Sequence, residues 1–117
     1  MTPIEKPWGK EEILEINNNY MVKKLTMWKG KRCSLQYHTK KCETIYVLNG
    51  ALKIYYGSDQ KSLFSKIFTI NEHITLAPGI IHRMEAVQDS IYIEASTPEI
   101  NDVIRLMDDY NRVNHEL

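Results

Sequence analysis

The sequence lacks several features that would place a protein outside the cell, in a membrane or on nucleic acid. It has only two cysteines, Cys33 and Cys42, among 117 residues, which is too few for a disulfide framework. We therefore expect both to be reduced thiols in a cytoplasmic protein. Lysine plus arginine and aspartate plus glutamate balance at 15 each. This balance does not favour binding to nucleic acid or to an anionic membrane surface.

Long apolar runs are also missing. No stretch approaches the length that spans a bilayer, and no charged segment followed by an apolar one indicates a secretion signal. The chain has no internal repeat and no low-complexity segment. Its length allows one hydrophobic core and leaves no room for a second. We therefore expect residues 1–117 to form a single domain that neither spans a membrane nor binds nucleic acid.

Short β-rich runs make up most of the chain. They cover residues 20–27, 32–38, 43–49, 51–56, 66–70, 73–76, 82–86 and 90–94. Asparagine, glycine, aspartate or proline marks turns between them, at residues 17–19, 29–30, 49–50, 57–59, 71–72 and 78–79. Evenly spaced short strands of this kind predict an all-β fold, a double-sheet jelly roll closed into a β-barrel.

The apolar period changes near the C-terminus. Side chains recur there at the i, i+3, i+4, i+7 spacing of one helix face; they are Ile100, Val103, Ile104, Met107 and Tyr110. Ser96 and Glu99 have the spacing of a capping box. We predict a C-terminal helix over roughly residues 96–114, packed against the barrel. Arg105 and Arg112 would share one face of it, where solvation is favoured over binding an anion.

Two separate segments carry residues of the kinds that bind divalent metals. Gln36 and His38 are two apart, so both side chains leave the same face of a strand. Glu43 follows after a turn's length of chain, and a Pro78-Gly79 turn precedes His82. Amide oxygen, imidazole and carboxylate suit a divalent ion such as zinc, iron, manganese or nickel. A solvated polar face would give the same alternation, so spacing alone supports both interpretations.

These segments resemble the paired motifs of the cupin superfamily, H-x-H-x(3,4)-E and P-x-G-x(2)-H, which bind one metal. Gln36 stands where the first histidine usually stands, and Pro78 and Gly79 are adjacent rather than separated. The chain is most similar to the C-terminal cupin domain of type II phosphomannose isomerase / mannose-1-phosphate guanylyltransferase enzymes. That similarity runs from about residue 6 to residue 112, through Pro7-Trp8-Gly9, residues 29–38, Glu43, Val47, Gly50, residues 77–83 and residues 102–112.

The resemblance implies a cupin-type jelly roll and a metal-dependent sugar-phosphate isomerase. The expected reaction interconverts mannose 6-phosphate and fructose 6-phosphate. The implied cofactor is one divalent ion, zinc before iron, manganese or nickel, held by Gln36, His38, Glu43 and His82. The Gly-rich nucleotide loop of the guanylyltransferase half does not occur in this sequence, so we do not expect nucleotidyl transfer.

Such an isomerase also needs a base that moves a proton between C1 and C2 and a cation that holds the phosphate. Glu94 lies in an apolar run and is the candidate base, because burial would raise its pKa; a surface position fits the pattern equally. Arg83, Arg32 and Lys41 are the candidate substrate-binding residues. Alternation along a strand could, however, turn Arg83 away from His82, and Lys41 lies in a predicted turn.

Two other functions stay open. One is a different metal-cupin enzyme, such as a dioxygenase, a lyase or a sugar-nucleotide epimerase, because a fold does not fix its chemistry. The other is a noncatalytic cupin that binds a metal and a sugar or related metabolite. Thr39, Lys40 and Thr44 occupy places where the resembled family has histidines, which favours these alternatives. The register over nearly the whole chain favours the isomerase.

We also expect a homodimer. Cys33, Leu35 and Tyr37 alternate with the proposed ligands, so strands carry apolar side chains on both faces. One face fills the barrel, and a partner subunit could cover the other. Cover by the N-terminal segment or by the predicted helix is the alternative.

Overall fold

The computed structural model of the chain describes residues 2–112. Every regular element within these residues is a β-strand, and there are eleven of them. They are β1 (Ile4–Lys6), β2 (Gly9–Ile16), β3 (Met21–Met27), β4 (Leu35–Tyr37), β5 (Glu43–Asn49), β6 (Leu52–Gly57), β7 (Phe64–Phe68), β8 (His73–Leu76), β9 (Ile81–Ala86), β10 (Ser90–Ser96) and β11 (Ile104–Met107).

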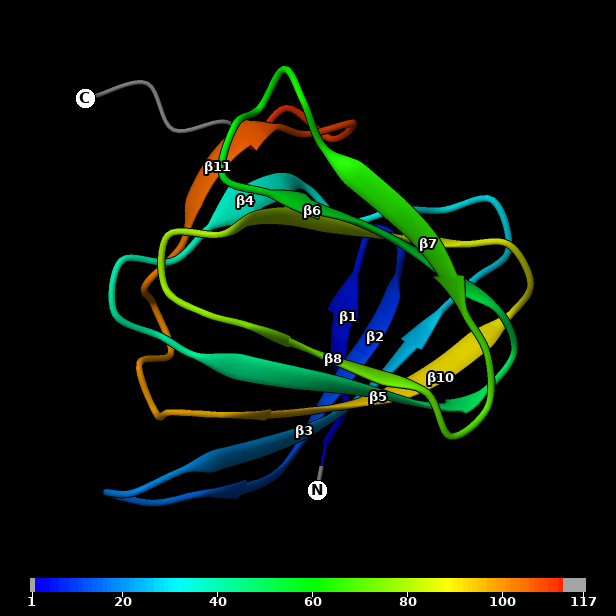
Figure 1. Cartoon of the computed structure of the whole chain (residues 1–117). Helices are drawn as coiled ribbons and strands as arrows, with labels where there is room; N and C mark the ends of the chain where they lie inside the picture. Colours follow the sequence, from blue (N-terminus) through cyan, green and yellow to red (C-terminus); the bar gives the residue numbers. More distant parts are fainter. Residues whose placement is uncertain (1, 113–117) are drawn as a thin grey trace.

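The strands form two antiparallel sheets that face each other. One has six strands in the order β1-β2-β3-β10-β5-β8, and the other has five in the order β11-β4-β9-β6-β7. Figure 1 shows the two sheets as lower and upper layers around a common interior. This arrangement confirms the predicted all-β double-sheet jelly roll. β5 and β8 have the bounds that the sequence predicts.

The core lies between the inner faces of the two sheets. Along β5 the side chains of Glu43, Ile45 and Val47 are buried, while Thr44 and Tyr46 are only partly so, because successive side chains of a strand point to opposite faces. Thirteen buried side chains form the core cluster: Trp8, Leu25, Met27, Cys33, Ile45, Val47, Leu52, Ile54, Phe68, Leu76, Met84, Ala86 and Tyr92.

The C-terminal helix predicted over residues 96–114 is wrong. β10 ends at Ser96, and residues 104–107 form β11, which pairs with β4; residues 113 and 114 lie outside the described residues. Without β11, the outer edge of β4 would present unpaired backbone N–H and C=O groups. Pairing with the sheet satisfies those groups, which a helix cannot do, and it overrides the apolar spacing. The sequence also failed to indicate β1 and β2.

Both cysteines are free thiols. Cys33 lies in the core, where burial raises the pKa of its thiol to about 11, and Leu35 is only 4% exposed. Neither side chain therefore offers the uncovered apolar surface on which the dimer expectation partly rested. In the described part of the chain, no helix has the length and apolar character needed to cross a membrane.

Candidate metal centre

Three ionisable side chains converge inside the barrel. His38 follows β4, Glu43 begins β5 and His82 lies in β9, and all three are at most 4% exposed. One potential ligand atom of each lies within 4.8 Å of the others. The His82 Nε2 atom is 2.9 Å from Glu43 Oε1, and His38 Nε2 is 3.4 Å from the same oxygen. We call these three residues the triad.

A tight turn delivers His82 to the triad. Gly79 adopts a φ of 86°, in the left-handed region that glycine enters without steric cost. Its N–H donates to the carbonyl of His38 at 2.7 Å, and Ile80 N–H closes the turn on Ala77 at 3.1 Å. The Pro78-Gly79 turn is therefore tied directly to the first ligand segment.

Backbone carbonyls orient both imidazole rings. His38 Nδ1 is hydrogen-bonded to the carbonyl of Asp102, and His82 Nδ1 to that of Ile80 at 3.0 Å. A carbonyl only accepts, so each Nδ1 carries the hydrogen, and a neutral ring presents the Nε2 lone pair. Neither Nε2 atom, nor Glu43 Oε1, makes a hydrogen bond with the described residues. Two imidazoles and a carboxylate fit one divalent cation.

The charge state of the triad favours cation binding. Burial opposes ionisation of Glu43, but contacts with His38 and His82 and the charge of Lys41 hold its pKa well below the usual value. Glu43 is therefore an anion at neutral pH. Burial also opposes a charged His38, yet the neighbouring Glu43 carboxylate raises the His38 pKa. The carboxylate thus attracts a proton or a metal ion to the same position.

Gln36 lies beside the triad. It is the antiparallel partner of His82 across β4 and β9, so both side chains leave the same face of the sheet, and it lines the cavity described below. Its amide oxygen accepts a hydrogen bond from the Ser34 hydroxyl. The role of Gln36 as a fourth ligand stays a prediction.

Lys41 and Glu94 extend the triad into a buried charge network. Lys41 Nζ is 2.7 Å from Glu94 Oε2 and 3.5 Å from Glu43 Oε2, and both Lys41 and Glu94 are almost fully buried. Burial raises the pKa of Glu94, and the charge of Glu43 adds to this effect, while Lys41 opposes it. A carboxyl with a raised pKa in a cavity has the character of a general acid or base.

The two predicted arginines lie elsewhere. Arg32 makes a bidentate contact with Asp109, at 2.7 and 2.9 Å. Arg83 follows His82 in β9, so it leaves the opposite face; its Nε donates to the Cys33 carbonyl at 3.0 Å. Neither guanidinium lines the cavity. Of the three predicted substrate-binding residues, the structure brings only Lys41 to the triad.

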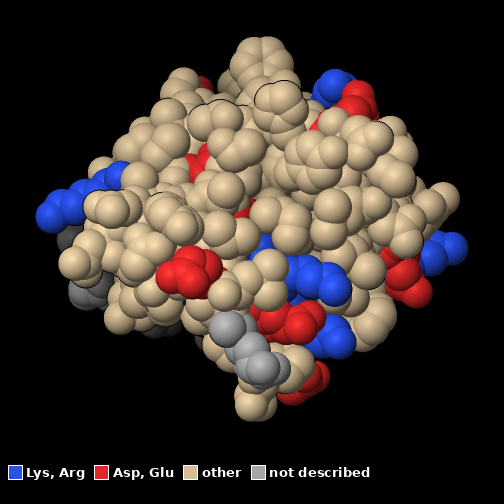
Figure 2. Space-filling view, turned by 90° about the horizontal axis from the view of Figure 1, so that it is seen from below, with Lys and Arg blue, Asp and Glu red and all other residues tan. Residues whose placement is uncertain are grey.

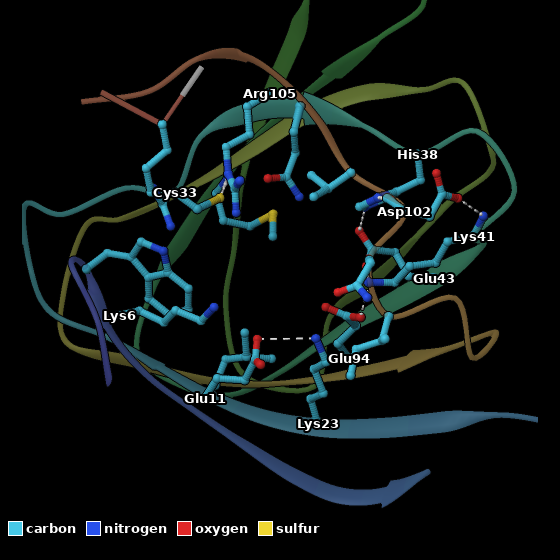
Figure 3. Close-up of a pocket in the computed structure, with 18 of the residues that line it drawn as sticks. Lys6, Glu11, Lys23, Cys33, His38, Lys41, Glu43, Glu94, Asp102 and Arg105 are labelled. Carbon is cyan, nitrogen blue, oxygen red and sulfur yellow. Dashed lines mark hydrogen bonds and ion pairs between the residues drawn. The ribbon is translucent and has the colours of Figure 1, made fainter. Parts of the chain in front are cut away.

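A cavity of about 220 Å³ opens next to the triad. Figure 3 shows His38, Glu43, Lys41 and Glu94 along one side of it. Sequence reasoning did not assign several other charged residues that line it to the site: Lys6, Glu11, Lys23, Arg105 and Arg112. Recognition of β2 would have placed Glu11 on an inner face, because it alternates there with outward-facing residues. The arginines were noticed but assigned to a helix surface.

Comparison with known proteins identifies the family of this chain. A family model described as the C-terminal part of mannose-6-phosphate isomerase matches residues 2–108. The chain belongs to this family. Mannose-1-phosphate guanylyltransferase of Escherichia coli K12 is 31% identical over 115 residues, covering 94% of this chain and 23% of that protein. XanB, a xanthan biosynthesis protein of Xanthomonas campestris, is 24% identical over 119 residues, covering 93% and 23%. The chain thus spans under a quarter of these relatives.

Solved structures share the cupin fold. KdgF from a Halomonas species aligns with a TM-score of 0.76 at 14% identity, over 86% of this chain and 89% of that one. Oxalate decarboxylase of Lactobacillus farciminis gives 0.76 at 18%, over 90% and 33%. The Bacillus subtilis oxalate decarboxylase, described with Mn(II) centres, gives 0.78 at 15%, over 91% and 30%. These likenesses support the fold alone.

Proposed function

We propose that this family member is a metal-dependent isomerase of a phosphorylated aldose, with mannose 6-phosphate and fructose 6-phosphate as the first pair to test. One observation carries the proposal: two members of a buried His-Glu-His triad, His38 and Glu43, line a cavity together with a carboxyl of raised pKa, Glu94. The family match supports the same substrate class.

The triad residues His38, Glu43 and His82 would hold the ion, with Gln36 as the candidate fourth ligand. We expect zinc first, then iron, manganese or nickel, since this donor set suits all four. A bound divalent ion would polarise the oxygens of the substrate at C1 and C2. The carbonyls of Asp102 and Ile80 keep the two imidazoles in the tautomer that this requires.

Glu94 would move the proton. In the direction from aldose to ketose, its carboxylate takes the proton from C2 and returns it to C1, while the hydroxyl proton of O2 passes to O1. Lys41, 2.7 Å away, holds this carboxylate in place and favours its ionised form. The raised pKa of Glu94 makes it a stronger base than an exposed carboxylate once it is ionised.

A coupled assay on metal-loaded protein tests this function. We expect turnover that disappears with a chelator and that falls by about 10²- to 10⁴-fold in Glu94→Gln, while that variant keeps its ion. Glu12→Gln, on the same sheet but away from the cavity lining, is the matched control. Solvent deuterium should enter the product at C1 or C2. Absence of metal-dependent turnover across hexose and pentose phosphates would reject the isomerase.

The replaced family histidines favour a second function, a noncatalytic metal- and sugar-binding cupin, or another metal-cupin enzyme. The places of Thr39, Lys40 and Thr44 in the structure weaken this argument against the isomerase. Thr39 and Lys40 are exposed, and the Thr44 hydroxyl contacts that of Thr75 at 2.8 Å. None of the three lines the cavity, so histidines there would not reach the triad from inside. Stoichiometric metal binding without turnover of any sugar phosphate would favour the binding protein.

We further propose that the protein is a cytoplasmic homodimer in which a second copy covers the outer face of the six-stranded sheet. Figure 2 views the molecule from the side where β3, β5 and β10 lie in Figure 1, and charged residues occupy only part of that face. Outward-facing Leu48 is 39% exposed there. Light scattering at micromolar concentration should give twice the chain mass; a monomer mass would reject the dimer.

A further inference from the structure

We propose that Glu11, Lys23 and Tyr92 form a subsite that binds hydroxyl groups of a sugar, on the carbons beyond the reacting C1 and C2. The choice of those carbons rests on the proposed function. All three side chains line the same cavity as His38 and Glu43. The sequence pattern gave none of the three a role in the site.

Four adjacent strands of the six-stranded sheet bring charged side chains to its inner face. In the order β5-β10-β3-β2 these are Glu43, Glu94, Lys23 and Glu11, and all four are buried. Lys23 is the direct antiparallel partner of Glu94, so both side chains leave the same face. Neighbouring strands lie about 4.8 Å apart. A molecule that reacts at Glu94 can therefore extend over Lys23, one strand away, and Glu11, two strands away.

Glu11 and Lys23 form an ion pair at the cavity wall. Lys23 Nζ is 3.2 Å from Glu11 Oε1, and the two side chains are 11% and 8% exposed. Figure 3 shows the pair next to Glu94, where β2 and β3 border the cavity. Within residues 2–112 neither side chain makes a second hydrogen bond. The second carboxylate oxygen of Glu11 and the other N–H groups of Lys23 are therefore available to a ligand.

The opposite charges of the pair select the kind of ligand. A charged group would be attracted by one partner and repelled by the other. A hydroxyl both donates and accepts, so it can donate to the Glu11 carboxylate while it, or a neighbouring hydroxyl, accepts from Lys23. The pair thus suits adjacent hydroxyl groups of a sugar. Lys6 also lines the cavity, which makes an anion the competing ligand in the test below.

Tyr92 supplies a second, independent observation. It is fully buried, and its hydroxyl has no hydrogen-bond partner in the part of the chain that the structure describes. A buried tyrosine hydroxyl usually has a partner, and phenylalanine would fill the same place in the core without needing one. Tyr92 lies two residues before Glu94 on β10, so both side chains leave the same face. The unpartnered hydroxyl therefore lies on the face that borders the cavity.

The ionisable groups that act on Tyr92 belong to the same cavity. Burial raises the pKa of Tyr92 well above its usual value, and Cys33, Glu94, Glu43 and Glu11 raise it further. All four of these residues line the cavity. Tyr92 is therefore protonated at neutral pH, and its hydroxyl can donate a hydrogen bond to a sugar oxygen.

Equilibrium binding tests the subsite without any need for turnover. Titrations of the protein, with and without chelator, would use mannose 6-phosphate, its 3-deoxy and 4-deoxy analogues, mannose and inorganic phosphate. We expect Tyr92→Phe to weaken mannose 6-phosphate binding by about 3- to 10-fold, as for one neutral hydrogen bond. Its melting temperature should not fall, because the hydroxyl has no partner to lose within residues 2–112. A tyrosine that only packs in the core would leave the affinity unchanged.

The double variant Lys23→Met/Glu11→Leu removes the ion pair without leaving an unpaired charge. We expect it to weaken mannose 6-phosphate binding by about 10-fold or more, since hydrogen bonds to charged groups are lost. It should also lose the preference of the wild type for mannose 6-phosphate over the deoxy analogues. The matched control is Lys24→Met/Glu12→Leu, a pair of partners on the same two strands outside the cavity lining. The control should keep both the affinity and the preference.

The outcomes separate this inference from the proposed function. Unchanged affinity for mannose 6-phosphate in either Tyr92→Phe or the double variant would overturn the subsite even if the protein is an isomerase. So would equal binding of mannose 6-phosphate and both deoxy analogues by the wild type, or no binding of any of these sugars. Weaker binding in both variants would support the subsite even if no sugar phosphate is turned over. Inorganic phosphate binding that weakens in both variants, with mannose binding unchanged, would assign the site to an anion instead.

Discussion

The two ends of the barrel interior use the same strands for opposite purposes. On β5 the inner positions run from Glu43 to Val47, and on β9 they run from His82 to Ala86. At one end they carry Glu43 and His82 of the triad. At the other they carry apolar side chains, Val47 on β5 and Ala86 on β9, that are almost fully buried. One strand therefore contributes to the site at one end and to the core at the other.

The two ends contribute differently to the free energy of folding. Burying an apolar side chain stabilises the fold by about 1.5–3 kcal/mol, whereas a buried charge is costly unless it is paired or binds a metal. The polar end contains Lys41 paired with Glu94 and three triad atoms without hydrogen bonds among the described residues. The apolar end holds the sheets together, and the polar end is arranged for a ligand.

The largest effect at the polar end is expected from removing a triad imidazole. Protein purified without chelator should contain close to one divalent ion per chain, and His38→Ala or His82→Ala should reduce this nearly to zero, because each removes one of three ligands. Elemental analysis measures the ion. The matched control is His73→Ala, an exposed histidine on β8, which should keep it. Full metal content in both triad variants would disprove the site.

The next largest effect is expected on the stability of the protein, from variants of the buried ion pair of Lys23 and Glu11. Lys23→Met alone should destabilise the protein by about 3–5 kcal/mol, because it leaves Glu11 buried and unpaired. The double variant Lys23→Met/Glu11→Leu should recover most of that loss, since an apolar pair of similar size avoids the desolvation cost. Urea unfolding of the wild type, both single variants and the double variant measures the coupling. Additive effects would contradict this account.

The apolar end should respond in the opposite way. Leu52→Ala should lower the free energy of unfolding by about 2–5 kcal/mol through lost burial and a residual cavity, while the metal content stays unchanged. Ile67→Ala, at a position 48% exposed on β7, should change stability by less than about 0.5 kcal/mol. Urea unfolding and elemental analysis of the same samples test both statements. Loss of the ion in Leu52→Ala would mean that the two ends are not independent.

The smallest effect is expected at Asp102, which fastens the loop after β4. Burial opposes its charge, but hydrogen bonds from the backbone N–H groups of Thr39, Lys40 and Lys41 lower its pKa overall. Its contribution to stability is therefore present above the unfolded pKa of about 3.9 and is lost as the pH falls through the lower folded value.

Melting curves of metal-free protein test this pH dependence. Asp102→Asn should lower the melting temperature by a few degrees at pH 7. The gap from the wild type should shrink as the pH falls below about 4, because Asp102 then takes up a proton in the unfolded chain while it stays ionised in the folded protein. The exposed Asp59, whose carboxylate accepts a backbone hydrogen bond from Lys61, provides the control as Asp59→Asn. A gap that stays constant down to the lowest pH would show that the charge of Asp102 does not matter.

Much of the fold could be predicted because strand alternation and turn chemistry are local. β5 has its predicted bounds, and glycine adopts the left-handed conformation at the Pro78-Gly79 turn. The spacing of His38, Glu43 and His82 also identified the groups that the structure brings together. The partners of Lys41 and Arg83 could not be predicted, since a period of two fixes the face of a side chain and not what lies opposite.

The sequence by itself determined the alternation that fills the barrel, the turns that join its strands and the residues available to hold a metal. Only the tertiary structure decided that residues 104–107 pair with β4 as a strand, because unpaired backbone groups at a sheet edge must find hydrogen bonds. That pairing turned Arg105 inward and set it two strands from His82. Contacts between distant segments depend on what the other segment offers, and no local pattern contains that information.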